Sequence, residues 1–502
     1  MKEYSIDEIH YQMEKGNLSA KKLVELYLNR IQEIDQNGLK INSVIEINQE
    51  AIKIAEELDK KSKNQNRDCL LYGIPVIIKD NINTGDKMQT TAGSLAFEGH
   101  IAREDAFIVR KLRKAGAIIL AKANLSEWAN FRSTRSTSGW SSRGGQTLNP
   151  YCLDRNPCGS SSGSAVAVAT GLCSVAIGTE TDGSIICPSQ TNSIVGIKPT
   201  VGLVSRTGII PISHNQDTAG PMARTVRDAA ILLSVIAGSD PDDPSTMNHN
   251  HEIPSDYTKF LDPNGLKEAR IGVARNYFGN SDLIDKIIEK SIEMMRKMGA
   301  IIIDPVEITS LKDLSDPEFQ VLLHDFKHDI NEYITKYGPI NSIRNLDDVI
   351  KFNTKYEEKV MPYFGQELLT MANEKGPITS EEYKEALEKC HRLAREEGID
   401  AVLKDYNLDV IIAPSGGAAW LIDYINGDHS TGGSASAAAV AGYPNITVPA
   451  GYIYGLPIGI SFFSNSFQEP TLLRIAYAFE QATKIRKPPK FLNSIEINTN
   501  HI

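Results

Sequence analysis

The chain has 502 residues, of which 41% are hydrophobic and 23% charged, the proportions of an ordinary globular protein. Its formal net charge of −10 disfavours a nucleic-acid-binding protein, because such proteins usually carry an excess of Lys and Arg. Residues 156–179 and 430–468 carry no Asp, Glu, Lys or Arg, but Ser, Asn, Gly and Pro interrupt both segments, which argues against a membrane span. We expect both segments to be buried parts of a globular fold.

The six cysteines, at positions 69, 152, 158, 173, 187 and 390, contain no C-x-x-C pair, so neither a zinc ribbon nor a thioredoxin-type motif is expected. A chain of this length does not need disulfide bonds for stability, and we predict free thiols in a reducing cytosol. Residues 1–6 have mixed charge and no apolar core, unlike a signal peptide. These features predict a cytoplasmic protein.

Apolar runs alternate with helical patterns along the chain, which predicts an α/β fold. Runs typical of buried strands lie at 71–78, 117–121, 271–274, 301–303, 410–412, 446–448 and 458–460. We predict a single domain at 1–490, with N-terminal helices at 1–66, a catalytic core at 67–310, a charged helical insertion at 311–404, the C-terminal part of the sheet at 405–490, and a tail at 491–502.

Lys79 ends the first of these apolar runs and is a candidate general base. Burial lowers the pKa of a lysine because its charged form loses hydration. Moving that pKa from about 10.4 to the 7–8 useful for catalysis corresponds to about 4 kcal/mol. The other interpretation is a lysine at a strand end, solvated or paired with Asp80.

A serine- and glycine-rich loop at 158–164 is the second candidate, because glycines allow sharp turns whose successive N–H groups bind anions. No Gly-Lys-Ser/Thr follows it, so a phosphate loop is not predicted. The loop matches G-x-S-x-G, the nucleophile elbow of α/β-hydrolases, with Ser161 as nucleophile and His429 with Asp423 or Asp428 as partners. That fold needs a strand directly before the elbow, which residues 149–157 cannot form, so an α/β-hydrolase esterase is the weaker alternative.

The turn at 178–186 is the third candidate, since its small residues can point several backbone N–H groups at one place, as an oxyanion hole requires. The simpler interpretation of this segment is a polar β-turn.

Together these blocks resemble the amidase-signature enzymes. The resemblance extends over nearly the whole chain and is carried by ordered motifs: Gly73-Ile74-Pro75 with Lys79-Asp80, Gly159-Ser160-Ser161, Thr181-Asp182-Gly183-Ser184, Gly196-Ile197-Lys198-Pro199-Thr200, Asp217-Thr218-Ala219-Gly220-Pro221 and Ala441-Gly442-Tyr443-Pro444-Asn445. It implies a mixed, mostly parallel sheet flanked by helices, and hydrolysis of a linear amide without a cofactor.

The resemblance also implies a Ser–cis-Ser–Lys triad. Ser184 falls on the family's acylated serine, Ser160 on the bridging serine that follows a cis peptide bond, and Lys79 on the buried base. The N–H groups of the turn, from Thr181, Asp182, Gly183 and Ser184, then bind the oxyanion, and the relay returns the proton to the leaving amine.

Further residues are implied in substrate binding. Trp128, Ala129 and Asn130 match a segment that lines the acyl side of the family's pocket, and Trp420 and Asp423 are expected on the leaving-group side. For Asp182 two roles stay open, binding of a substrate N–H or fixing of its own loop through the backbone.

Two departures from the family pattern favour a branch. Asp182 replaces a glycine and Ile186 an arginine that the glutamine-hydrolysing subunit of tRNA-dependent amidotransferases generally keeps. The chain looks more like the peptide amidases, which hydrolyse C-terminal peptide amides to carboxylate and ammonia. The glutamine-hydrolysing subunit stays the alternative. A small-molecule or short-peptide amide is the expected partner, with no nucleic acid, membrane or obligate partner chain.

One helical segment has spacing that could suit a metal. His324 and His328 lie four residues apart on an expected helix, with Asp325 and Asp329 beside them. This spacing suits a zinc pair, but no third ligand is recognisable, so no metal is predicted.

Overall fold

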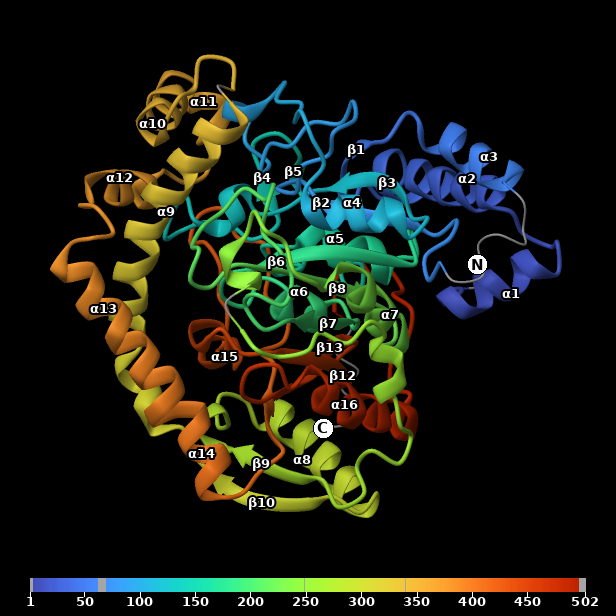
Figure 1. The fold of residues 1–502 in the computed structure, drawn as a ribbon, viewed down its shortest axis with the longest axis vertical. Helices are drawn as coiled ribbons and strands as arrows, with labels where there is room; N and C mark the ends of the chain where they lie inside the picture. The colour runs from blue at the N-terminus through green and yellow to red at the C-terminus, as the bar shows by residue number, and fades with distance from the viewer. Residues whose placement is uncertain (1–2, 62–68, 248, 339, 496–502) are drawn as a thin grey trace.

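The computed structural model describes residues 3–61, 69–247, 249–338 and 340–495. Its centre is one mixed sheet of 11 strands, in the order β1-β3-β2-β6-β8-β7-β12-β13-β11-β9-β10 (Figure 1). The strands are β1 Val44–Ile47, β2 Pro75–Lys79, β3 Ile118–Ala123, β6 Val175–Glu180, β7 Val195–Lys198, β8 Thr218–Ala223, β9 Arg270–Ala274, β10 Ile301–Val306, β11 Val410–Pro414, β12 Asn445–Ile453 and β13 Leu456–Phe463, with a separate small ribbon of β4 Trp140–Ser141 and β5 Gly145–Gln146.

Parallel pairing occurs at two places in the sheet, β3–β2–β6 and β11–β9–β10. The strands between these places, and the edge strand β1, pair antiparallel. The expected single α/β domain with a mixed sheet is confirmed.

All seven apolar runs expected to be strands form strands. Four main-sheet strands, β1, β6, β7 and β8, were not among the expected runs. The first lies inside the segment 1–66 that was expected to be helical throughout, and β8 contains Gly220-Pro221, a pair that disfavours a strand in sequence reasoning. Pairing with neighbours on both sides compensates for this weak local preference in β8.

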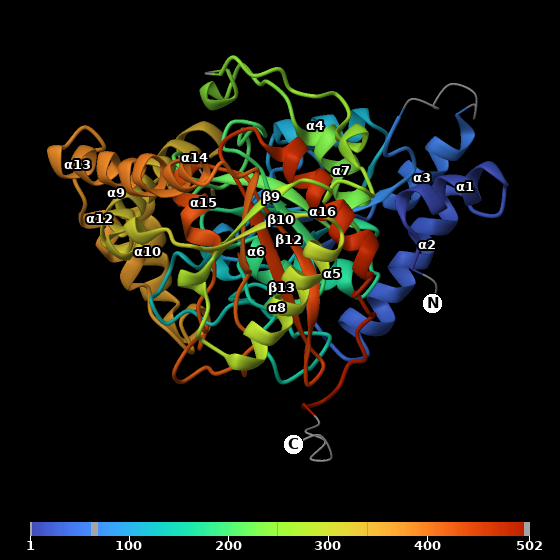
Figure 2. The ribbon, with the colours of Figure 1, turned by 90° about the horizontal axis from the view of Figure 1, so that it is seen from below.

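Helices cover the sheet and both of its ends. They are α1 Ile6–Glu14, α2 Ala20–Arg30, α3 Ala51–Lys60, α4 Phe107–Lys114, α5 Ser162–Ala169, α6 Ile186–Thr191, α7 Val226–Ile236, α8 Asp282–Lys297, α9 Ser315–Tyr337, α10 Leu346–Lys355, α11 Glu357–Val360, α12 Glu367–Glu374, α13 Glu381–His391, α14 Asp400–Asp405, α15 Ala435–Ala441 and α16 Glu469–Thr483. Helices α1–α3 lie at one side of the molecule and α9–α14 at the opposite side in both views (Figures 1 and 2).

The domain boundary expected between residues 66 and 67, and residues 496–502 of the expected tail, lie outside the described residues. Among the helices that the described segments form, none is both long and apolar enough to cross a bilayer.

The charge-free segment 156–179 is buried at every position, as predicted. It contains α5, whose small residues let neighbouring backbone approach closely. A Cβ added at Gly163 would lie 2.2 Å from the Ser43 carbonyl oxygen, so only glycine fits there. The second charge-free segment is less uniform, because residues 430–433 are exposed.

A buried ion pair fixes the segment that follows β3. Arg132 donates to Glu127 at 2.8 Å, and both side chains have an exposed fraction of 0%. The same guanidinium donates to the carbonyl oxygens of Val360, Phe364 and Gly365, which joins this segment to the region between α11 and α12.

We expect Arg132→Met to lower the free energy of unfolding by about 3–5 kcal/mol, because Glu127 would be left as a buried charge without its partner. Denaturant titration measures this change. Arg227→Ala is the control, since its pair with Asp7 is about half exposed and should contribute less than about 1 kcal/mol. Equal losses in the two variants would contradict the interpretation.

Candidate active site

Lys79 and Ser160, far apart in sequence, are in direct contact. The Lys79 amine donates to the Ser160 hydroxyl at 2.7 Å and to Thr179 at 3.1 Å (carbonyl oxygen) and 2.9 Å (Oγ1). Both Lys79 and Ser160 have an exposed fraction of 0%. Parallel pairing of β2 with β6 brings Thr179 beside the lysine. The peptide bond between Gly159 and Ser160 is cis, as the resemblance implies.

Burial lowers the pKa of Lys79 to about 7, and the more distant carboxylates of Asp217 and Glu180 oppose this shift. No carboxylate of the described chain lies within ion-pair distance of its amine. Asp80, the other partner considered for Lys79, instead contacts Arg143 at 3.4 Å. The amine is therefore able to be neutral near neutral pH.

Ser184 lies in the turn between β6 and α6 and has an exposed fraction of 7%. The Glu180 carboxylate fixes this turn by accepting from the N–H groups of Ile185 at 2.7 Å and Ile186 at 2.9 Å. The Ser161 N–H donates to the Ser184 carbonyl at 3.2 Å, which joins the turn to the Ser160 loop.

The N–H groups of Asp182, Gly183 and Ser184 donate no hydrogen bond to other groups in the described part of the chain. The adjacent Thr181 hydroxyl donates to Asp217 at 2.6 Å, and its carbonyl accepts from Gln216 at 3.3 Å. Side-chain contacts therefore support the turn while these N–H groups stay available.

A disulfide bond joins Cys158 to Cys187, with 5.9 Å between their Cα atoms. The prediction of free thiols is therefore wrong for this pair, while Cys69, Cys152, Cys173 and Cys390 are free. The 29-residue separation gave no local signal, because only the folded chain brings the two loops together. The cytoplasmic location stays a prediction, without the support that six free thiols would have given it.

We expect Cys187→Ser to lower the free energy of unfolding by about 2–4 kcal/mol, because the unfolded chain regains the freedom that the cross-link removes. Thermal melting with and without reductant checks this. The control is Cys69→Ser, which replaces a partly exposed free thiol. A melting temperature of the wild type that reductant does not change would contradict the expectation.

The α/β-hydrolase alternative does not fit the geometry around Ser161. This hydroxyl donates to the Thr179 carbonyl at 3.0 Å and accepts from the Thr179 N–H at 3.2 Å, so β6 holds it. His429, the histidine considered for that triad, pairs with Asp423 at 3.3 Å, and its side chain is 56% exposed. No strand precedes the elbow within residues 147–161.

A cavity of about 300 Å³ borders the turn at 181–184. Its wall includes Thr179, which contacts Lys79. Thr181 and Asp217 also line it. Of the five residues expected to bind substrate, Ala129 lines this cavity. It belongs to the stretch Trp128–Asn130, whose three residues have left-handed φ angles of 52°, 53° and 72°.

The other expected substrate contacts have partners within the protein. Trp128 packs edge-on against Phe97 with ring centroids 4.9 Å apart, and Asn130 donates to Ser138 at 2.9 Å. Trp420 is buried, and its indole N–H donates to Asp428 at 3.0 Å. Asp423 accepts from the N–H groups of its own loop at 425 and 426, which lowers its pKa.

The Asp182 carboxylate accepts from the Ser436 hydroxyl at 2.7 Å, next to the start of α15. Burial and the charge of Asp182 raise the pKa of Glu318 on α9 well above its usual range. Glu318 also accepts from Gln216 at 3.0 Å. The turn at 181–184 is thus in contact with α15 and, through Gln216 and Glu318, with α9.

The histidine pair considered for zinc does not form one group. His324 is buried and its ring contacts the Gly376 carbonyl at 3.1 Å, whereas His328 is exposed and contacts Asp329 at 2.8 Å.

Sequence reasoning missed the roles of Thr179, Glu180 and Asp217 around the candidate triad. All three lie within or beside the motifs that carry the resemblance, so their position was a usable signal. Their contacts depend on which strands pair, which the motifs do not state.

The chain matches the family model described as Amidase over residues 22–473. Together with the fold, this match defines an enzyme of the amide-hydrolysing class. The chain belongs to the amidase signature family, and the resemblance found in the sequence is confirmed.

Individual relatives include both branches that the sequence suggested. The solved peptide amidase from Stenotrophomonas maltophilia superposes with a TM-score of 0.92 at 47% identity, covering 97% of this chain and 99% of that chain. A probable amidase of Arabidopsis thaliana is 41% identical, over 98% of this chain and 92% of the relative. A glutamyl-tRNA(Gln) amidotransferase subunit of Thermoanaerobacter pseudethanolicus is 34% identical, over 97% of this chain and 98% of the relative.

Proposed function

We propose that this amidase hydrolyses the C-terminal carboxamide of peptides, with Ser184 as nucleophile, Ser160 as proton relay and Lys79 as base. The observation that carries the proposal is the 2.7 Å contact between the Lys79 amine and the Ser160 hydroxyl at a fully buried position. The lowered pKa of Lys79, about 7, makes its neutral form available without an activating histidine.

In the proposed reaction, neutral Lys79 accepts the proton of Ser160, which in turn accepts that of Ser184. The Ser184 oxygen attacks the amide carbon. When the C–N bond breaks, the relay returns the proton to the leaving nitrogen and ammonia departs. Water then attacks the Ser184 ester by the same relay, which releases the carboxylate and restores the serine.

The N–H groups of Thr181, Asp182, Gly183 and Ser184 are the proposed oxyanion donors. Their support is a turn held by Glu180 whose N–H groups at 182–184 have no acceptor within the described residues. One such donor is worth about 2.7–4 kcal/mol in the transition state.

Three observations support a peptide amide as substrate. The chain is 47% identical to a peptide amidase over nearly its full length. The oxyanion turn contains Asp182 and Ile186, the departures that favoured this branch. A cavity of about 300 Å³ adjoins the turn, which is room for side chains beyond the amide itself. We propose that the other expected substrate contacts contribute to substrate binding indirectly, by positioning the residues that they touch. They are Trp128, Asn130, Trp420 and Asp423.

We expect kcat/KM to fall about tenfold per pH unit below pH 7 and to level off above it, because only neutral Lys79 accepts a proton. The pKa is lowered in the folded protein, so raising the pH populates the active form. A pH–rate profile with a peptide amide measures this. A plateau that begins only near pH 10 would contradict a desolvated base.

We expect Lys79→Ala to lower kcat by about 10²–10⁴. His429→Ala is the matched control, because an esterase triad would require this residue and the proposed triad does not. Steady-state kinetics of both variants decide between the two. Amidase activity that survives in Lys79→Ala would refute the triad.

The substrate is tested by ammonia release from an amidated peptide, from free glutamine and from an aryl amide, with Ser184→Ala as control. We expect turnover of the peptide amide that disappears in the variant. Turnover of glutamine alone would assign the amidotransferase branch instead. Activity that persists in Ser184→Ala would show that the nucleophile is another residue.

A further inference from the structure

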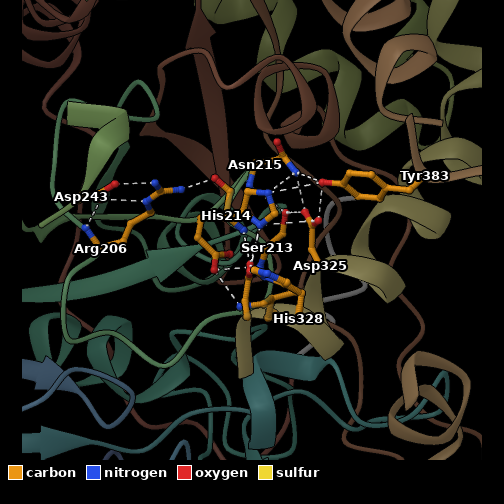
Figure 3. Close-up of polar contacts among 11 residues, drawn as sticks. Arg206, Ser213, His214, Asn215, Asp243, Asp325, His328 and Tyr383 are labelled. Atoms are coloured by element: carbon orange, nitrogen blue, oxygen red, sulfur yellow. Dashed lines mark hydrogen bonds and ion pairs between the residues drawn. The ribbon is translucent and has the colours of Figure 1, made fainter. Parts of the chain in front are cut away.

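Two histidines and an aspartate, His214, His328 and Asp329, form a cluster, of which His214 and Asp329 line the cavity. Figure 3 shows His214 and His328 close together. His214 comes from the loop before β8, and His328 and Asp329 come from α9. One ligand-type atom of each lies within 4.8 Å of the others. Both imidazoles present Nδ1 to the same carboxylate, His214 at 3.0 Å and His328 at 2.8 Å.

The far side of the His214 ring is held by a chain of polar groups. Its Nε2 lies 3.4 Å from the Tyr383 hydroxyl, which donates to Asp325 at 2.7 Å. The Asn215 amide nitrogen lies 3.3 Å from the His214 Nε2, and it donates at the shorter distance of 2.8 Å to both Asp325 and Tyr383, so its two protons are directed to oxygen. The Tyr383 oxygen is therefore the acceptor left for a proton on Nε2.

This arrangement directs the His214 Nδ1 lone pair at Asp329 when the ring is neutral. A lone pair facing a carboxylate is repulsive unless a proton or a metal cation lies between them. A ring whose second N–H is fixed by a hydrogen-bond partner is how proteins orient a metal-ligating histidine. The Tyr383–Asp325 pair supplies that partner.

We propose that His214, His328 and Asp329 form a binding site for a divalent transition metal of the Zn²⁺ type. Two imidazole nitrogens and one carboxylate oxygen suit such an ion, and three protein ligands leave a further position for water. The bound ion would take the place of any protons between the two imidazoles and the carboxylate. It would form coordination bonds with all three groups. The Oδ2 atom of Asp329 also accepts from the His214 backbone N–H at 2.6 Å, so this ligand is already oriented.

The site belongs to the cavity wall, because His214 and Asp329 line the cavity together with Thr181 and Asp217. Asp217 accepts from the N–H groups of Ile212 and Ser213 at 2.8 Å and 3.0 Å, so the loop before β8 connects the metal site to the oxyanion turn. The proposal concerns metal binding alone and does not depend on the catalytic triad.

The test is calorimetric titration of the full chain, freed of any affinity tag and treated with chelator, with ZnCl₂ alone. We expect one saturable site and a higher melting temperature with Zn²⁺. His328→Ala and His214→Ala should each weaken Zn²⁺ binding by at least about tenfold. Co²⁺ bound to the wild type should give the visible absorption of nitrogen and oxygen coordination, and the two variants should lose it.

His429→Ala is the matched control, because His429 also pairs with an aspartate but has no second imidazole in that pair. It should bind Zn²⁺ as the wild type does, and Mg²⁺ should not compete, since it prefers all-oxygen ligands. His328 is exposed, so its replacement leaves the core intact, and the melting temperature of the metal-free variant verifies this. Absence of saturable Zn²⁺ binding, or binding that is unchanged in His328→Ala and His214→Ala, would overturn the proposal.

Discussion

Desolvation of Lys79 is the constraint on which the proposed active site depends. A lysine amine at the end of a central strand has lost its water, and the protein offers it no direct ion pair among the described residues. Thr179 and Ser160 accept hydrogen bonds from it instead, and these neutral groups do not stabilise the charge as a carboxylate would. The fold thus keeps the amine near neutrality by position, since β2 has strands on both sides.

The turn that carries Ser184 is held by acidic side chains that take no part in the proposed reaction themselves. Glu180 fixes its backbone, and Asp217 holds Thr181. Burial raises the pKa of Asp217 to about 6, so part of its charge is lost in mild acid. These carboxylates lie far enough from Lys79 to leave its pKa low, yet close enough to oppose a larger shift. The same two carboxylates therefore fix the turn and partly offset the effect of burial on the pKa of Lys79.

Much of this site could be predicted from the sequence, because its residues lie in motifs with their own local character. Lys79 ends a β-branched run, and such a run predicts a buried strand. Strand β8 could not be predicted in this way, because Gly220-Pro221 has no strand preference and only its neighbours hold it extended. The family resemblance supplied the roles of Ser160 and Ser184, which spacing alone did not define.

Contacts between segments that lie far apart in the chain could not be predicted from the sequence. Cys158 and Cys187 carry no local sign of pairing, and His214 was overlooked beside His328 because they are more than a hundred residues apart. The zinc pair considered on one helix used residues that were neighbours in sequence, while the cluster for which we propose metal binding takes one histidine from a loop. Helical spacing identifies one face of one element and nothing beyond it.

The disulfide gives the active site a particular topology. Residues 158–187 form a closed covalent ring, and this ring contains Ser160, Ser184, α5 and β6. Local opening normally releases one loop at a time. Here the loop of one serine and the first turn of α6 after the other are tied end to end, so neither can detach without displacing the other. The two serines thus lie within one covalently closed segment whose ends cannot separate.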